Sequence, residues 1–98
     1  MIYNLAIELG SKFTSIYKAG VGVILKESSL IAMKQVGKEK QVVACGDDAK
    51  KMVNKTNTIT EVVAPIKNGA IESFLYAKEM LKFFLNKINE KFKHFFGV

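Results

Sequence analysis

The chain has 98 residues, of which 49% are hydrophobic and 24% are charged, and its formal net charge is +6. This composition excludes a wholly disordered chain, and the length suits one small domain over residues 1–98 or a fragment of a larger domain. All 15 basic residues are lysines, which argues against a specific nucleic-acid partner because base readout depends heavily on bidentate arginine contacts. The lysine excess either provides a general attraction to anions or reflects only a bias in composition.

The cysteine and histidine content excludes an intrachain disulfide and a zinc site built from these residues. Cys45 is the only cysteine, so no intrachain disulfide can form, and its apolar surroundings at 42–44 predict a buried, unreactive thiol. His94 is the only histidine, so no Cys/His cluster is available to hold zinc. No apolar run approaches the roughly 20 residues that a transmembrane helix needs, and the N-terminus lacks a secretory signal pattern.

The first two thirds of the chain alternate between short apolar or β-branched runs and glycine-containing turns. Such turns leave no room for the crossovers that parallel strands need, so the pattern predicts an antiparallel meander. Residues 26–29 are polar and are expected to interrupt the strands, and 37–40 are expected to form a hairpin tip. The predicted strands are 2–7, 14–17, 23–25, 30–36, 41–45 and 60–66.

Two helices are predicted. Asp47 is expected to cap a short helix that ends before Asn54. From Ser73 onwards apolar residues recur with a period of 3.6, which predicts an amphipathic helix of about 20 residues packed on the early strands. Between the helices, Pro65 ends a strand and Asn68-Gly69 forms a turn. The predicted fold class is therefore α+β: an antiparallel β-meander with a short helix and a long C-terminal amphipathic helix.

The turn between the first two predicted strands contains the parts of a phosphate-binding site. Gly10 allows backbone amides to approach a phosphate closely, and Ser11 and Thr14 supply hydroxyl groups. Lys12 supplies positive charge, and the Glu8 carboxylate can hold the water shell of a Mg²⁺ ion. The chain has neither the Walker nor the Rossmann glycine pattern, which excludes P-loop and dinucleotide-binding folds. A polar turn that binds nothing remains the alternative.

Four segments extend this pattern along the chain: Ile7-Glu8-Leu9-Gly10-Ser11-Lys12-Phe13-Thr14, Gly20–Ser29, Cys45–Lys50 and Pro65–Phe74. In the same order and at matching spacing, they resemble the Ile-Asp-Leu-Gly-Thr-Ala-Asn-Thr opening and three later segments of MreB-type bacterial actins. These proteins form the rod shape-determining family within the actin, Hsp70 and sugar-kinase superfamily. The resemblance covers nearly the whole chain and corresponds to the N-terminal portion of the family.

The resemblance implies N-terminal subdomains of an actin-like ATPase fold, in a cytoplasmic filament protein that acts in cell shape. The chain has Glu8 where the family has aspartate, Lys12 where a small residue is usual, and Phe13 where asparagine contacts phosphate. The rest of the family's nucleotide site lies in later segments. ATP and Mg²⁺ are therefore expected to bind weakly or not at all to the isolated chain, without hydrolysis. The residues implied at the site are Gly10, Ser11, Lys12 and Thr14 for phosphate, with Glu8 near Mg²⁺ through water.

The phenylalanine- and lysine-rich end of the last predicted helix leaves alternatives open. Residues 82–96 have the composition of a helix that lies on an anionic membrane surface, which would place the protein at the inner face of the membrane. Otherwise this helix packs its apolar face on the sheet, and uncovered apolar residues promote self-association or contact with the remainder of an actin-like protein. The alternative function is a small lysine-rich interaction module that binds a protein partner or membrane surface without nucleotide.

Overall fold

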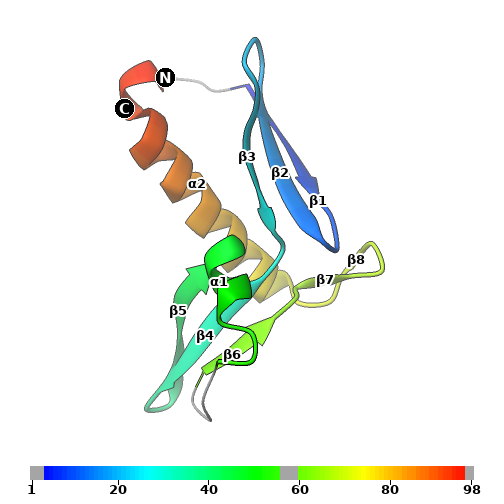
Figure 1. Cartoon of the computed structure of the whole chain (residues 1–98), viewed down its shortest axis with the longest axis vertical. Helices are drawn as coiled ribbons and strands as arrows, with labels where there is room; N and C mark the ends of the chain where they lie inside the picture. The colour runs from blue at the N-terminus through cyan, green and yellow to red at the C-terminus, as the bar shows by residue number, and fades with distance from the viewer. Residues whose placement is uncertain (1–3, 56–59, 97–98) are drawn as a thin grey trace.

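The computed structural model describes residues 4–55 and 60–96, and side chains as far as residue 91. Its architecture is the predicted α+β class, with two three-stranded antiparallel sheets at opposite ends of the molecule and the long helix α2 running along both (Figure 1). Sheet A has the order β1-β2-β3, sheet B has the order β5-β4-β6, and β7-β8 is a separate hairpin. The elements are β1 (Leu5–Leu9), β2 (Phe13–Lys18), β3 (Gly22–Ser28), β4 (Ile31–Val36), β5 (Glu39–Cys45), α1 (Asp47–Lys51), β6 (Thr60–Val63), β7 (Ile66–Lys67), β8 (Ala70–Ile71) and α2 (Phe74–Phe96).

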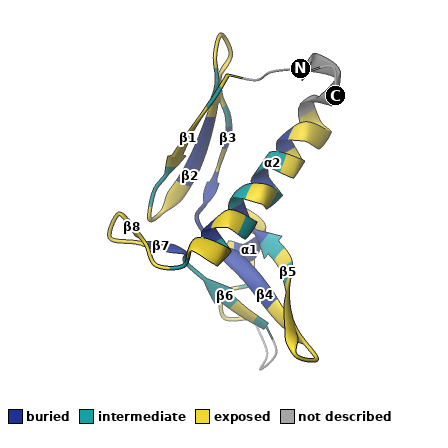
Figure 2. Ribbon diagram, turned by 180° about the vertical axis from the view of Figure 1, so that it is seen from behind, coloured by how far each residue is buried: buried dark blue, intermediate teal, exposed yellow. Residues whose placement is uncertain are grey.

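Helix α2 supplies the centre of the hydrophobic core. Its buried residues recur every three or four positions and therefore share one face: Ala77, Met80, Phe84 and Ile88. This face packs against apolar residues of sheet A, sheet B and β7 in a single cluster (Figure 2). The expected packing of the helix on the early strands is confirmed, and it extends to the second sheet. No helix in the described ranges is long and apolar enough to cross a membrane.

The six predicted strands appear in the expected order as β1 to β6, but their bounds differ, and the structure adds the short strands β7 and β8 after the last predicted strand breaks at Val63. Strand β1 begins at Leu5 and continues through Glu8 to Leu9, whereas the predicted strand ended at 7; its first residues, 2–3, lie outside the described residues. The predicted interruption at 26–29 is wrong for its first three residues, because β3 continues to Ser28. Glu27 and Ser28 are buried there, and both form hydrogen bonds with Asp47. Partners far along the chain thus keep a polar segment in the strand.

The N-terminus of α1 also differs from the prediction. Its N-cap is Gly46, with φ of 70°, which has no side chain to form a capping hydrogen bond. Asp47 lies one position later, and its Oδ1 atom accepts hydrogen bonds from the Ser28 N–H and hydroxyl group, each at 3.0 Å. The expected N-cap residue therefore bonds to the end of β3. At α2, by contrast, the Ser73 hydroxyl accepts a hydrogen bond from the Tyr76 N–H at 3.2 Å, as expected for a cap.

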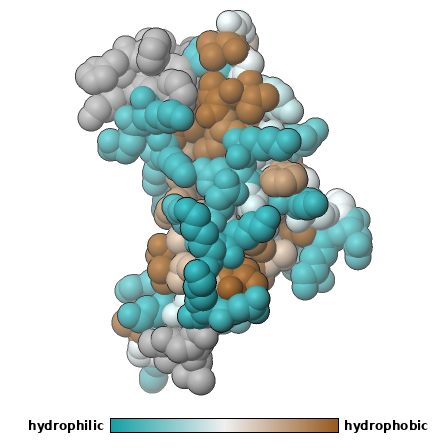
Figure 3. All heavy atoms as spheres, in the orientation of Figure 1, coloured by the Kyte–Doolittle hydropathy of each residue, from teal (hydrophilic) through white to brown (hydrophobic). Residues whose placement is uncertain are grey.

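The face seen in Figure 3 is largely hydrophilic, with its most extended apolar area between sheet A and the C-terminal half of α2 and smaller apolar patches lower down. A hollow in this region is lined by Val23, Ile24 and Ile88 beside the polar pair Glu27 and Lys87. Sheet A and α2 therefore separate towards the upper end of the molecule in Figure 1, while they remain joined near Glu27.

Candidate phosphate-binding site

The turn between β1 and β2 is closed by one backbone hydrogen bond. The Gly10 N–H donates to the Phe13 carbonyl at 2.9 Å. A Cβ atom on residue 10 would lie 2.7 Å from that same carbonyl oxygen, closer than non-bonded atoms tolerate. Glycine is therefore required for the shape of the turn, which confirms the predicted strand–turn–strand unit.

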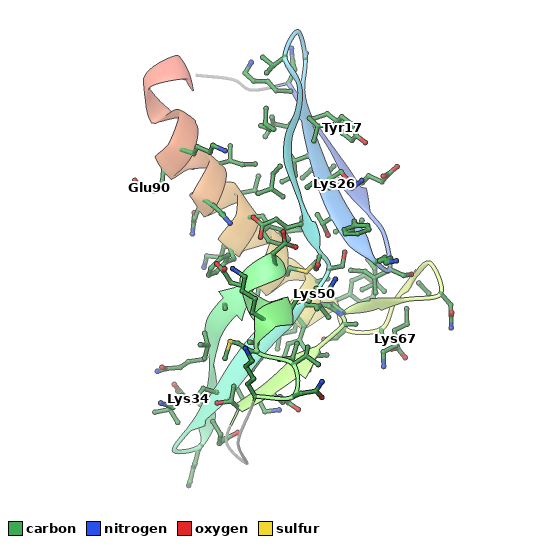
Figure 4. The ribbon with its side chains drawn as sticks, viewed as in Figure 1. Tyr17, Lys26, Lys34, Lys50, Lys67 and Glu90 are labelled. Carbon is green, nitrogen blue, oxygen red and sulfur yellow. The ribbon has the colours of Figure 1, made fainter. Side chains whose placement is uncertain are left out.

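Strand register places a row of polar residues across the face of sheet A that points away from α2. Glu8 on β1 pairs with Ser15 on β2, and Ser15 pairs with Lys26 on β3. Their neighbours Ile16 and Leu25 are buried in the core, and successive strand residues alternate between faces. The row therefore lies on the outer face of the sheet, where Figure 4 labels Tyr17 and Lys26.

This outer face carries an open hollow of about 490 Å³ beside the turn. Four of the predicted site residues line it: Glu8, Gly10, Ser11 and Lys12. The hollow is completed by Phe13, Ser15, Tyr17, Val23 and Lys26. Ser15 and Lys26 were not among the predicted site residues, because their positions beside the turn depend on strand register. Counting alternate residues outward from the two glycine turns is the signal that could have found them.

Thr14 does not line the hollow with the other predicted residues. Its side chain is fully buried, and its hydroxyl shares a 2.8 Å hydrogen bond with the Ser29 hydroxyl. The Ser29 N–H also donates to the Lys12 carbonyl at 3.0 Å. The Ser11 hydroxyl, in turn, accepts a 2.8 Å hydrogen bond from the Gly69 N–H. In this arrangement Thr14 and Ser11 hold the turn against two other parts of the chain.

Two lysines surround the ring of Phe13 at the edge of the hollow. The Nζ atom of Lys26 lies 5.0 Å from the ring centroid and that of Lys12 lies 5.8 Å from it, both within cation–π range. Within 4–55 and 60–91, neither ammonium group has a carboxylate within ion-pair distance. The charges of the two lysines are therefore not neutralised by a nearby acid.

The residues of the hollow fit a divalent cation poorly. Glu8 is its only carboxylate, and the described residues contain no group of three or more His, Cys, Asp or Glu that could hold a metal. A single carboxylate can still contact hydrated Mg²⁺ through water when phosphate oxygens complete the shell. The positive charges of Lys12 and Lys26 in the same hollow oppose such a cation.

A second polar cluster, formed by Glu27, Ser28, Asp47 and Lys87, joins three elements of the fold. Glu27 accepts hydrogen bonds from the Lys87 ammonium group and, at 3.1 Å, from the Asp47 N–H. The Ser28 N–H holds the pKa of the Asp47 carboxyl below its ordinary value, and the hydrogen bond to Glu27 raises the pKa of Lys87. These contacts fasten β3, α1 and α2 together, so the cluster is structural.

Comparison with known proteins assigns the family. The model of the MreB/Mbl protein family matches residues 2–96, nearly the whole chain. The chain belongs to the MreB/Mbl family. It is 36% identical over 88 residues to the cell shape-determining protein MreB of Escherichia coli K12, covering 88% of this chain. It is 37% identical over 89 residues to the cell shape-determining protein Mbl of Bacillus subtilis 168, covering 90% of this chain.

The MreB/Mbl chain covers only part of these relatives, 25% of the E. coli protein and 26% of the B. subtilis protein. Solved structures agree with the actin-like fold. MreB5 of Spiroplasma citri bound to ADP matches with a TM-score of 0.75 and 29% identity, covering 89% of this chain and 26% of that one. The same protein bound to AMPPNP matches with a TM-score of 0.71 and 32% identity, covering 80% and 23%. The predicted resemblance to the N-terminal portion of MreB is thus confirmed.

Proposed function

We propose that this chain serves as the nucleotide-binding N-terminal quarter of an MreB-type cell-shape protein and carries the first phosphate-binding hairpin of an ATP site. The observation that carries the proposal is the family match over residues 2–96, together with structural neighbours that were solved with AMPPNP and ADP. The β1–β2 turn keeps the required glycine, and the hollow beside it gathers Glu8, Gly10, Ser11 and Lys12.

In this proposal the chain supplies only some of the contacts that a nucleotide site needs. Lys12 and the backbone of the turn would face phosphate oxygens, while Glu8 would contact Mg²⁺ only through water. Thr14 would support the turn through Ser29 and would not touch the ligand. With so few groups facing the ligand, the chain by itself binds nucleotide weakly and does not hydrolyse it.

A nucleotide titration tests this proposal. Mg-ATP at millimolar concentration should raise the melting temperature of the 98-residue chain, because a ligand that binds only the native state stabilises it. Lys12→Glu should abolish the shift, whereas Lys38→Glu, the same change at the exposed β4–β5 tip, should leave it unchanged. A flat response of the wild-type chain throughout the millimolar range would refute the nucleotide part of the proposal.

The proposed setting is the bacterial cytoplasm, with self-association as the expected mode of assembly. Apolar side chains support this: Phe74 and Leu75 at the start of α2 are 78% and 63% exposed, and contiguous apolar surface promotes association. Sedimentation velocity over a range of protein concentrations tests it, and a strict monomer would count against an assembly role. The proposed membrane contact depends on phenylalanines at 92–96, whose side chains lie outside the described residues; co-sedimentation with anionic vesicles tests it.

A further inference from the structure

We propose that the outer hollow of sheet A binds oligophosphate directly through the ammonium groups of Lys12 and Lys26, without a divalent cation. The inference rests on the proposed function and specifies the ligand charge that this site selects. It concerns two side chains in which the chain departs from the MreB-type pattern, Lys12 in place of a small residue and Phe13 in place of asparagine, together with Lys26 beside them.

The geometry brings these three side chains to one place. Lys12 lies in the turn and Lys26 lies on β3, and their Nζ atoms lie 5.8 Å and 5.0 Å from the centroid of the same Phe13 ring. All three residues line the hollow of about 490 Å³. The ring orients both ammonium groups by cation–π attraction, which is weak at exposed sites and leaves donor hydrogens available to a ligand.

The charges in the hollow indicate whether it binds a phosphate with a bound metal ion or a metal-free phosphate. The hollow contains two lysines against one carboxylate, Glu8, which is two strands away from Lys26 in the same cross-strand row. Neither lysine is paired with an acid in the described part of the chain. Mg²⁺ neutralises part of the charge of a triphosphate and is repelled by both ammonium groups. The metal-free anion is therefore the better ligand.

Isothermal titration calorimetry of the full 98-residue chain tests this inference at low salt, with inorganic tripolyphosphate and ATP as probes, each in EDTA and in excess Mg²⁺. The Kd for both probes should be about threefold lower in EDTA than in Mg²⁺, as expected for exposed charge pairs. Lys12→Ala and Lys26→Ala should each raise the Kd in EDTA by about threefold. Glu8→Gln should lower it, because this change removes the one repulsive charge.

Lys34→Ala is the matched control, because Lys34 is exposed on β4 at the opposite end of the molecule (Figure 4). It removes the same charge and should leave the Kd unchanged. An equal effect of Lys34→Ala would overturn the inference, since attraction would then be general. Binding of Mg-ATP that disappears in EDTA would overturn the inference and leave the proposed function standing. Absence of binding under both conditions would overturn both.

Discussion

Glu27 on β3 and Lys87 on α2, 60 residues apart in the sequence, form a hydrogen-bonded ion pair at the junction of sheet A and the long helix. The Glu27 residue is only 8% exposed, and its carboxylate has one further donor, the Asp47 N–H at 3.1 Å. A buried carboxylate is stable as an anion only while such donors remain. The pair therefore couples the position of sheet A to that of α2 and α1.

Removal of the lysine should destabilise the fold. Lys87→Ala leaves the Glu27 carboxylate with a single donor, and we expect a loss of about 1–2 kcal/mol in the free energy of unfolding, at the lower end for a buried pair because the Lys87 side chain is 45% exposed. Urea denaturation measures the loss. Lys82→Ala on the same helix, where no ion pair forms among the described residues, should change stability by less than about 0.5 kcal/mol. Equal effects of the two substitutions would contradict the assigned role of the pair.

Substitution of Gly46, which lies where β3, α1 and α2 meet, should lower the free energy of unfolding more than substitution of a glycine in an open turn. The φ of Gly46 is 70°, and a Cβ atom there would lie 2.2 Å from Glu27 Oε1 and 2.9 Å from Phe84 Cε1. Gly46→Ala should therefore cost about 2–4 kcal/mol through strain and displacement of the ion pair. Gly37→Ala is the matched control, since φ is 63° but the space around it is open, and it should cost about 1 kcal/mol. Denaturant unfolding of both variants compares them, and similar losses would refute the steric argument.

Stability should depend on the Cys45 thiol at alkaline pH. Burial, with smaller contributions from the charges of Glu27 and Glu79, raises the pKa of this thiol from 9.0 to about 12. Between pH 9.0 and about 12, the Cys45 thiol keeps its proton in the native state but releases it in the unfolded chain. The native state then binds more protons, so stability falls as pH rises, with a limiting slope of about 1.4 kcal/mol per pH unit. Well below pH 9.0 the thiol is protonated in both states, so it contributes no pH dependence to the free energy of unfolding.

Cys45→Ala separates this effect from the titration of the lysines. The slope of unfolding free energy against pH should be shallower in the variant, while lysine titration contributes equally to both proteins. The native thiol should also resist an aromatic disulfide reagent near neutral pH and react when urea unfolds the chain. Rapid labelling of the native protein, or identical slopes for both proteins, would show that the thiol is not held in the core.

The Thr14–Ser29 pair should be a stability element rather than a ligand contact. Thr14→Val leaves the buried Ser29 hydroxyl without its 2.8 Å partner, at a cost of about 1–3 kcal/mol. Ser29→Ala added to Thr14→Val should recover part of that loss, since both polar groups are then removed. Nucleotide affinity, measured where each variant is folded, should remain at the wild-type level. A loss of affinity in Thr14→Val without a loss of stability would restore Thr14 as a phosphate ligand.

The sequence by itself determined the local units of this protein. Period 3.6 in the apolar residues predicted α2, and glycine or Asn-Gly turns predicted the hairpins, with φ of 52° at Asn68 and 78° at Gly69. The order of four motifs predicted the family that the comparison then assigned. These features depend on residues close together in the chain, where turn geometry and helix periodicity act, so one sequence was sufficient.

Only the tertiary structure decided how distant polar groups are paired. The polar residues at 26–29 predicted an interruption between strands, yet Glu27 lies in β3, because the Lys87 ammonium group and the Asp47 N–H donate hydrogen bonds to its carboxylate. Thr14 matched the phosphate motif, yet its hydroxyl meets Ser29 in the interior. Ser15 and Lys26 line the hollow only because the strand register of sheet A places them beside it. A buried charge or hydroxyl is stable only with a partner, and which partner reaches it depends on packing between segments that the local pattern does not relate.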